Sequence, residues 1–193
     1  ARETTQQHFG KRGIGWHGFL IYFYKYVEKD VTLASGVVVK AIRHMIYIDQ
    51  ILKGSNKQDT FAVACMLEVD FHQLKEELPW IEEAVLQSDN AMCYQSSELI
   101  FLIMLFQHKC PVQISRFIHS ETQDGKCLID AHFARGTAHI QRFMKTSKRN
   151  RIVRIATANG LAAALAWDNG IQNSVVQLVV LDRTKVEETK VLV

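Results

Sequence analysis

The order of strand-like and helix-like patterns along these 193 residues is the feature that most constrains the fold. Two runs rich in aromatic and β-branched residues, 19–26 and 36–51, come first and predict a β-hairpin or a meander. A helix is predicted from about residue 60 to 78, because Asp59 can cap its start and Pro79 ends it. The chain therefore begins with paired strands and continues into a helix.

Strand and helix patterns alternate over the remaining residues. Further strands are predicted at 81–87, 112–119 and 175–181, and further helices at 96–109, 128–144 and 156–167. The 96–109 helix is apolar enough to be largely buried. This order predicts an α/β fold with a mixed sheet flanked by helices, in a single domain that spans residues 1–193.

Composition limits the class of protein. Hydrophobic residues make up 48% and charged residues 22%, as in ordinary globular proteins. The net charge of +3 permits a nucleic-acid partner without requiring one. The four cysteines form no CxxC pair, which indicates reduced thiols in a nuclear or cytoplasmic protein, with a secreted effector as the alternative. The longest apolar run, 99–106, is far below the ~20 residues that span a membrane, so we expect no membrane partner.

Acidic residues are the first candidates for chemistry. Asp89 follows a predicted buried strand, and catalytic groups of open α/β sheets gather beyond the carboxyl ends of strands. Asp130 lies in the first turn of the 128–144 helix, and Glu121, Asp124 and Asp182 are further acidic candidates. Converging carboxylates bind Mg²⁺ or Mn²⁺, and such ions activate water and stabilise phosphate leaving groups. The alternative for Asp89 is a structural turn or helix cap.

Basic residues form the second group of candidates. The nucleic-acid-binding candidates are Lys11, Arg12, Arg142, Lys145, Lys148, Arg149, Arg151 and Arg154. Positive charge over phosphates gives sequence-independent, salt-sensitive binding, whereas the alternative is a solvated helix end. The aromatic residues Tyr22, Phe23, Tyr24 and Tyr26 can stack on bases, but the strand pattern favours packing in the core. His132 is interpreted as packed or capping, since it does not share a helical face with Asp130.

Four segments carry a resemblance to a known family. They are 9–17 (FGKRGIGWH), 87–94 (QSDNAMCY), 121–126 (ETQDGK) and 129–132 (IDAH). Together they resemble transposon-derived proteins with a ribonuclease-H-like core, over residues 3–182. The resemblance implies that Asp89 and Asp130 are two of the three metal-binding carboxylates of a DDE-type nuclease or transposase.

The resemblance also implies a departure from the family pattern. The family's first acidic residue lies on a central strand upstream of the 9–17 segment, so we expect that ligand and strand to be missing. The 175–181 strand, a homo-oligomeric copy or another protein partner would then complete the sheet, and Asp49 or Asp182 would be a replacement carboxylate. The expected function is a transposase-derived DNA-binding domain with an incomplete DDE site, inactive in isolation. The alternative is an inactive domesticated fragment that binds proteins as a regulatory or effector module.

Overall fold

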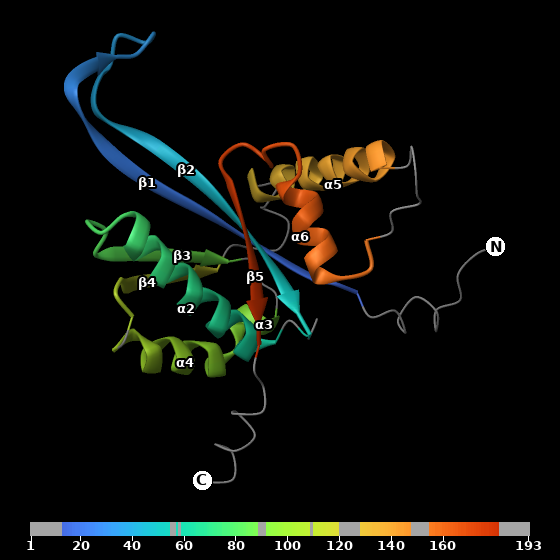
Figure 1. Ribbon diagram of the computed structural model, residues 1–193. Helices are drawn as coiled ribbons and strands as arrows, with labels where there is room; N and C mark the ends of the chain where they lie inside the picture. The colour runs from blue at the N-terminus through green and yellow to red at the C-terminus, as the bar shows by residue number, and fades with distance from the viewer. Residues whose placement is uncertain are drawn as a thin grey trace. The chain divides into compact units, whose positions relative to one another are not determined.

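The computed structural model describes residues 13–54, 57, 59–88, 92–108, 110–119, 128–147 and 155–181. The described residues form strands and helices in the mixed α/β order that the sequence predicts (Figure 1). The chain divides into two compact units. We call residues 16–51 and 128–177 the hairpin unit, and the described residues of 13–15, 52–119 and 178–181 the parallel-strand unit. The single-domain organisation stays a prediction.

The hairpin unit is built on two long strands. Strand β1 (Gly15–Thr32) turns directly into β2 (Val38–Lys53), and Figure 1 shows the two as one extended hairpin. The turn is closed by the Leu33 N–H, which donates to the Val37 carbonyl at 2.8 Å. Strand β5 (Ser174–Val180) lies next to β2, so the sheet order is β1-β2-β5. Of the hairpin and the meander, the structure has the hairpin.

Two helices belong to the hairpin unit, α5 (Leu128–Ser147) and α6 (Ala158–Ala166). Glycines let α5 approach β1 closely: a Cβ on Gly136 would lie 2.6 Å from the Trp16 ring, and one on Gly18 would lie 2.7 Å from the Phe133 ring. The buried face of α5 therefore depends on small residues as well as apolar ones.

The parallel-strand unit contains the remaining elements. They are α2 (Thr60–Glu77), β3 (Glu83–Ser88), α3 (Met92–Gln95), α4 (Ser97–Gln107) and β4 (Gln113–His119). The Asp59 carboxylate accepts a hydrogen bond from the Ala62 N–H at 3.1 Å, which confirms the predicted cap of α2. Strands β3 and β4 are parallel, with Glu83 opposite Gln113 and Ser88 opposite His119.

Two predictions about packing need correction. The mixed α/β character is confirmed, but the described strands are divided between a three-stranded sheet, β1-β2-β5, and a two-stranded sheet, β3-β4. The β2–β5 and β3–β4 pairings join segments far apart in sequence, so local patterns do not specify them. Helix α4 is also less buried than predicted: it buries Leu99 and Ile103 but exposes four of its large apolar side chains. The exposed ones are Ile100, Phe101, Met104 and Leu105.

Two further features bear on the class of protein. Among the described residues, no helix combines the length and the apolar character that crossing a membrane requires. The described cysteines, Cys65, Cys93 and Cys110, are thiols and form no disulfide.

Candidate functional site

The carboxyl ends of β3 and β4 lie side by side. Because the strands are parallel and in register at their last residues, the Ser88 Oγ and His119 Nδ1 atoms approach to 3.0 Å. In the sequence, Asp89 directly follows β3, and Glu121 follows β4 by two residues. Strand β3 ends at Ser88, one residue beyond the predicted 81–87, so Asp89 directly follows a parallel strand. The prediction that this strand is buried is wrong, because its side chains are alternately exposed and half-buried. Open α/β sheets bind their ligands at such an edge.

Most of the predicted metal ligands lie outside the described residues. These are Asp89, Glu121, Asp124 and Asp182. Asp130 is described: it is exposed in the first turn of α5, in the hairpin unit, whereas Ser88 and His119 belong to the parallel-strand unit. The convergence of Asp89 and Asp130 therefore stays a prediction. Within the described residues, no group of three or more His, Cys, Asp or Glu side chains is placed to hold a metal ion.

The described part of the predicted basic surface lies at the end of α5. Arg142 and Lys145 are both exposed there. One guanidinium nitrogen of Arg142 lies 3.5 Å from His139 Nδ1, and His139 Nε2 donates to the Trp167 carbonyl at 2.9 Å. The other candidates, Lys11, Arg12, Lys148, Arg149, Arg151 and Arg154, lie outside the described residues.

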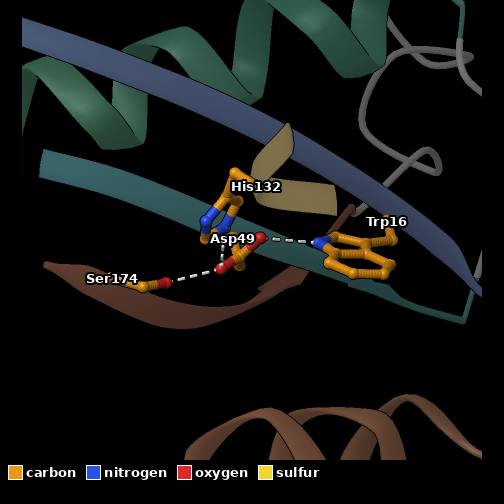
Figure 2. Close-up of polar contacts among 4 residues, drawn as sticks. All are labelled: Trp16, Asp49, His132 and Ser174. Atoms are coloured by element: carbon orange, nitrogen blue, oxygen red, sulfur yellow. Dashed lines mark hydrogen bonds and ion pairs between the residues drawn. The ribbon is translucent and has the colours of Figure 1, made fainter. Parts of the chain in front are cut away.

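A buried polar centre in the hairpin unit is the most elaborate arrangement of described side chains. Figure 2 shows Trp16, Asp49, His132 and Ser174, which we call the Asp49 cluster. Asp49 Oδ1 accepts from Trp16 Nε1 at 2.8 Å, while Oδ2 accepts from Ser174 Oγ at 2.5 Å and from His132 Nε2 at 2.8 Å. Asp49 is fully buried and His132 is 1% exposed. The cluster joins β1, β2, α5 and β5 through one carboxylate.

Hydrogen bonds keep the Asp49 carboxylate charged despite its burial. Burial alone raises the pKa of a carboxyl group, since water no longer stabilises the anion. The hydrogen bonds from His132, Ser174 and Trp16, with the electrostatic attraction of His132, outweigh this and hold the pKa of Asp49 below its ordinary 3.8. The His132 ring also stacks on Tyr47, with centroids 4.1 Å apart and planes 5° apart. The Asp49 cluster is therefore a buried anion surrounded by donors.

The geometry of the Asp49 cluster is that of a structural centre and not of a catalytic site. Ser174 and His132 bond to the same carboxylate oxygen and not to each other, so they do not form the relay of a serine hydrolase. Both oxygens of Asp49 already accept hydrogen bonds, and a metal ion would have to displace these donors. The interpretation of His132 as a packed residue is confirmed by its burial. Asp49, considered a replacement metal ligand, instead ties four elements together.

Sequence reasoning missed most of this cluster. Trp16 and Ser174 were not candidates, and the cluster joins residues 33, 83 and 125 positions apart. The only local signal is on α5, where His132, Gly136 and His139 occupy the buried stripe at i, i+4 and i+7. Polar residues at the centre of a buried stripe indicate a partner from another element, because buried polar groups need one.

The aromatic residues of β1 also differ from their prediction. Phe23 is buried at 8% exposure, but the tyrosines predicted to pack in the core are not: Tyr22 is 44%, Tyr24 61% and Tyr26 89% exposed. Successive side chains of a strand point to opposite faces, so Phe23 and the tyrosines lie on different faces of β1. Composition alone does not indicate which face is covered.

Comparison of the chain with models of protein families, with curated proteins and with solved structures finds no match.

Proposed function

We propose that this chain is a transposase-derived nucleic-acid-binding domain with a ribonuclease-H-like fold and an incomplete DDE-type site for divalent ions. The observation that carries the proposal is the parallel β3–β4 edge, where Ser88 and His119 meet; in the sequence Asp89 directly follows Ser88, and Glu121 follows His119 by two residues. An antiparallel hairpin, a parallel strand pair and flanking helices are also the parts of which ribonuclease-H-like sheets are built. The resemblance of the sequence segments supports the same assignment.

The chemistry of the proposed site rests on oxygen ligands. Carboxylates of Asp89, Asp130 and either Glu121, Asp124 or Asp182 are the hard donors that Mg²⁺ and Mn²⁺ prefer. The described residues do not form this ligand set by themselves. Such ions, when bound, supply charge stabilisation at phosphate. This chain would contribute the Asp89 carboxylate, which follows β3 directly in the sequence, and the His119 imidazole, which lies beside Ser88 and could contact phosphate.

The ligand count determines the expected activity. The resemblance places the third carboxylate on a segment upstream of residue 9, and Asp49, one replacement considered for it, is committed to its own cluster. Two aspartates hold one ion loosely, whereas two-metal phosphoryl transfer needs ligands that bridge and flank both ions. We therefore propose that the isolated chain binds DNA but cleaves it slowly or not at all in Mg²⁺ or Mn²⁺.

DNA binding through the basic run is the first testable prediction. Replacing Lys148, Arg149 and Arg151 together with alanine should weaken binding to unrelated DNA duplexes by the same factor, because phosphate contacts carry no sequence information. It should also reduce the slope of log affinity against log salt concentration by about 3, roughly one for each lost contact. Fluorescence anisotropy with two labelled duplexes at several salt concentrations measures both effects.

A matched control uses a cation outside the run. Lys57 is exposed and lies 3.1 Å from the Asp59 carboxylate, so Lys57→Ala should leave the salt dependence unchanged. If the triple variant and the unaltered chain bound DNA with equal affinity, the basic run would be an ordinary solvated surface and not a DNA-binding site. Absence of DNA binding at every salt concentration would contradict the proposed function.

A protein-binding module is the second candidate function, and one observation favours it. Helix α4 exposes Ile100, Phe101, Met104 and Leu105, four large apolar side chains on neighbouring turns. A contiguous exposed apolar surface of this kind is typical of protein interaction sites. Protein binding through α4 would be the favoured function if the chain bound no nucleic acid.

A further inference from the structure

Helix α4 is apolar on two opposite faces. One face is buried through Leu99 and Ile103. The opposite face exposes four large apolar side chains at i, i+1, i+4 and i+5, to between 47% and 63%. Its ends are polar, because Ser97 and His108 are exposed there. A helix that is apolar all round is normally covered on all sides, whereas α4 is covered on one. We call the exposed face, residues 97, 100, 101, 104, 105 and 108, the α4 surface.

The α4 surface is symmetric about its midpoint. If a second copy of α4 packs against it in the antiparallel direction, positions equally far from the midpoint lie opposite each other. Phe101 then faces Met104 of the second copy, and a methionine sulfur beside an aromatic ring is a favourable contact. By the same rule Ile100 faces Leu105, and the polar ends face each other. Apolar side chains therefore meet apolar ones along the whole surface.

We propose that two copies of this chain associate through their α4 surfaces, with the two helices antiparallel about a two-fold axis. A two-fold interface uses the same surface on both copies and requires it to be self-complementary, which the α4 surface is. The inference rests on the second candidate function, protein binding through α4, and names its partner. It does not depend on DNA binding.

The charge of α4 favours a second copy over a charged partner. From Ser97 to Gln107 the helix has one charged residue, Glu98, in its first turn. Nucleic acid and anionic membrane surfaces bind through lysine and arginine, which this stretch lacks. In the antiparallel pair the two Glu98 residues lie near opposite ends, about 14 Å apart along the helices, which exceeds the screening length of ~8 Å at physiological salt. Self-association therefore brings no like charges together.

The exposed area fits a small dimer interface. A large apolar side chain has an area of about 200 Å², and the four on the α4 surface are each about half exposed, which leaves about 450 Å² on one copy. Two copies would bury about 900 Å² through these side chains alone. The polar ends add to this area and bring it toward the lower limit of specific interfaces, about 1,200 Å². We therefore expect a dimer that forms at micromolar concentrations.

Sedimentation equilibrium of the full chain tests the dimer directly. We expect the unaltered chain to change from monomer to dimer across micromolar concentrations, in a reducing buffer that keeps the thiols from linking chains. Phe101→Glu should weaken dimerisation by at least about 100-fold, because each dimer loses a central contact twice and gains two buried charges. Val69→Glu is the matched control: Val69 is exposed on α2, outside the α4 surface, so this variant should dimerise normally.

A mixing experiment tests the antiparallel register. Phe101→Glu and Met104→Lys should each be monomeric alone, because each places an unpaired charge in the interface. Phe101 of one copy faces Met104 of the other, so a mixture of the two variants pairs the new charges and should recover dimers. Both residues are more than 60% exposed, and circular dichroism checks that each variant stays folded.

The outcomes separate this inference from the proposed function. Dimers that are lost in Phe101→Glu, kept in Val69→Glu and recovered on mixing support the α4 interface. Monomers of the unaltered chain at every concentration overturn it, and protein binding by α4 would then need a different partner. Dimers that persist in Phe101→Glu, or that do not return on mixing, overturn the proposed interface or its register. DNA binding by the basic run is measured on the same samples and bears on the DNA-binding proposal alone.

Discussion

Asp49→Ala is expected to lower the free energy of unfolding of the hairpin unit by about 3–5 kcal/mol, as removal of one partner of a buried charged pair does. The alanine leaves Trp16 Nε1, Ser174 Oγ and His132 Nε2 without their acceptor in a buried centre. Each donor then has to stay unsatisfied, or the unit has to open to water. Hydrogen exchange in increasing denaturant, followed on peptides from α5, measures the stability of this unit separately.

Two control variants show how much of the destabilisation by Asp49→Ala comes from single hydrogen bonds and how much from the carboxylate as a whole. Ser174→Ala removes one donor and leaves the others bonded, so it should cost only about 1 kcal/mol. Asp49→Asn keeps one acceptor oxygen but turns an amide donor toward other donors, so its cost should lie between the two. If Asp49→Ala were no more destabilising than Ser174→Ala, the cluster would not hold the four elements together.

The same carboxylate predicts the response of the hairpin unit to acid. The pKa of Asp49 is lower in the folded chain than its ordinary 3.8, so folding favours the charged form. Its contribution is fully present above about pH 4 and is lost as the pH falls through the folded-state value. Acid should therefore destabilise the hairpin unit through Asp49, and the Asp49→Ala variant should lack this part of the dependence.

Asp70→Asn is expected to stabilise the parallel-strand unit, with an effect that grows with pH. Asp70 lies on the buried face of α2 at 5% exposure, and burial raises the pKa of its carboxyl group from 3.8 to about 8. The unfolded chain therefore releases this proton at a lower pH than the folded chain does. Stability is greatest below about pH 4, falls as the pH rises to about 8, and is constant above. The total loss is on the order of 5 kcal/mol.

The Asp70 prediction has a matched control on the same helix. Glu68 is exposed on α2, and Glu68→Gln should change stability by less than about 0.5 kcal/mol at any pH. Denaturant unfolding between pH 4 and 9, followed by exchange on α2 peptides, compares the variants. A stability of the unaltered chain that rose across this window, or a slope that persisted in Asp70→Asn, would contradict the assignment.

Local patterns in the sequence predict the elements well. The Asp59 cap and the apolar spacing that follows it predict a helix over 60–78, and α2 runs from Thr60 to Glu77. An Asn-Gly pair favours a turn, and Asn169 and Gly170 have positive φ angles, 62° and 70°, before β5. These features depend on residues a few positions apart, whose propensities act without help from the rest of the chain.

Features that depend on distant residues were not predicted. Asp49 meets its partners only when β1, β2, α5 and β5 have assembled, and nothing near it in sequence indicates three donors. The tyrosines of β1 have high strand propensity whether they are covered or exposed, so propensity did not distinguish a buried face from an exposed one. Of the candidate metal site, the sequence predicted strand ends at 87 and 119, close to the observed Ser88 and His119, but not the parallel register that brings these two residues together.

A Mn²⁺ titration followed by nuclear magnetic resonance tests the proposed divalent-ion site most directly. A paramagnetic ion broadens the signals of nearby amides. We predict that the signals of Ser88 and His119 broaden first, that Asp130 broadens with them if it shares the ion, and that Asp89→Asn abolishes the effect. Broadening that spares Ser88 and His119, or that persists in Asp89→Asn, would contradict a divalent-ion site at the edge of β3 and β4.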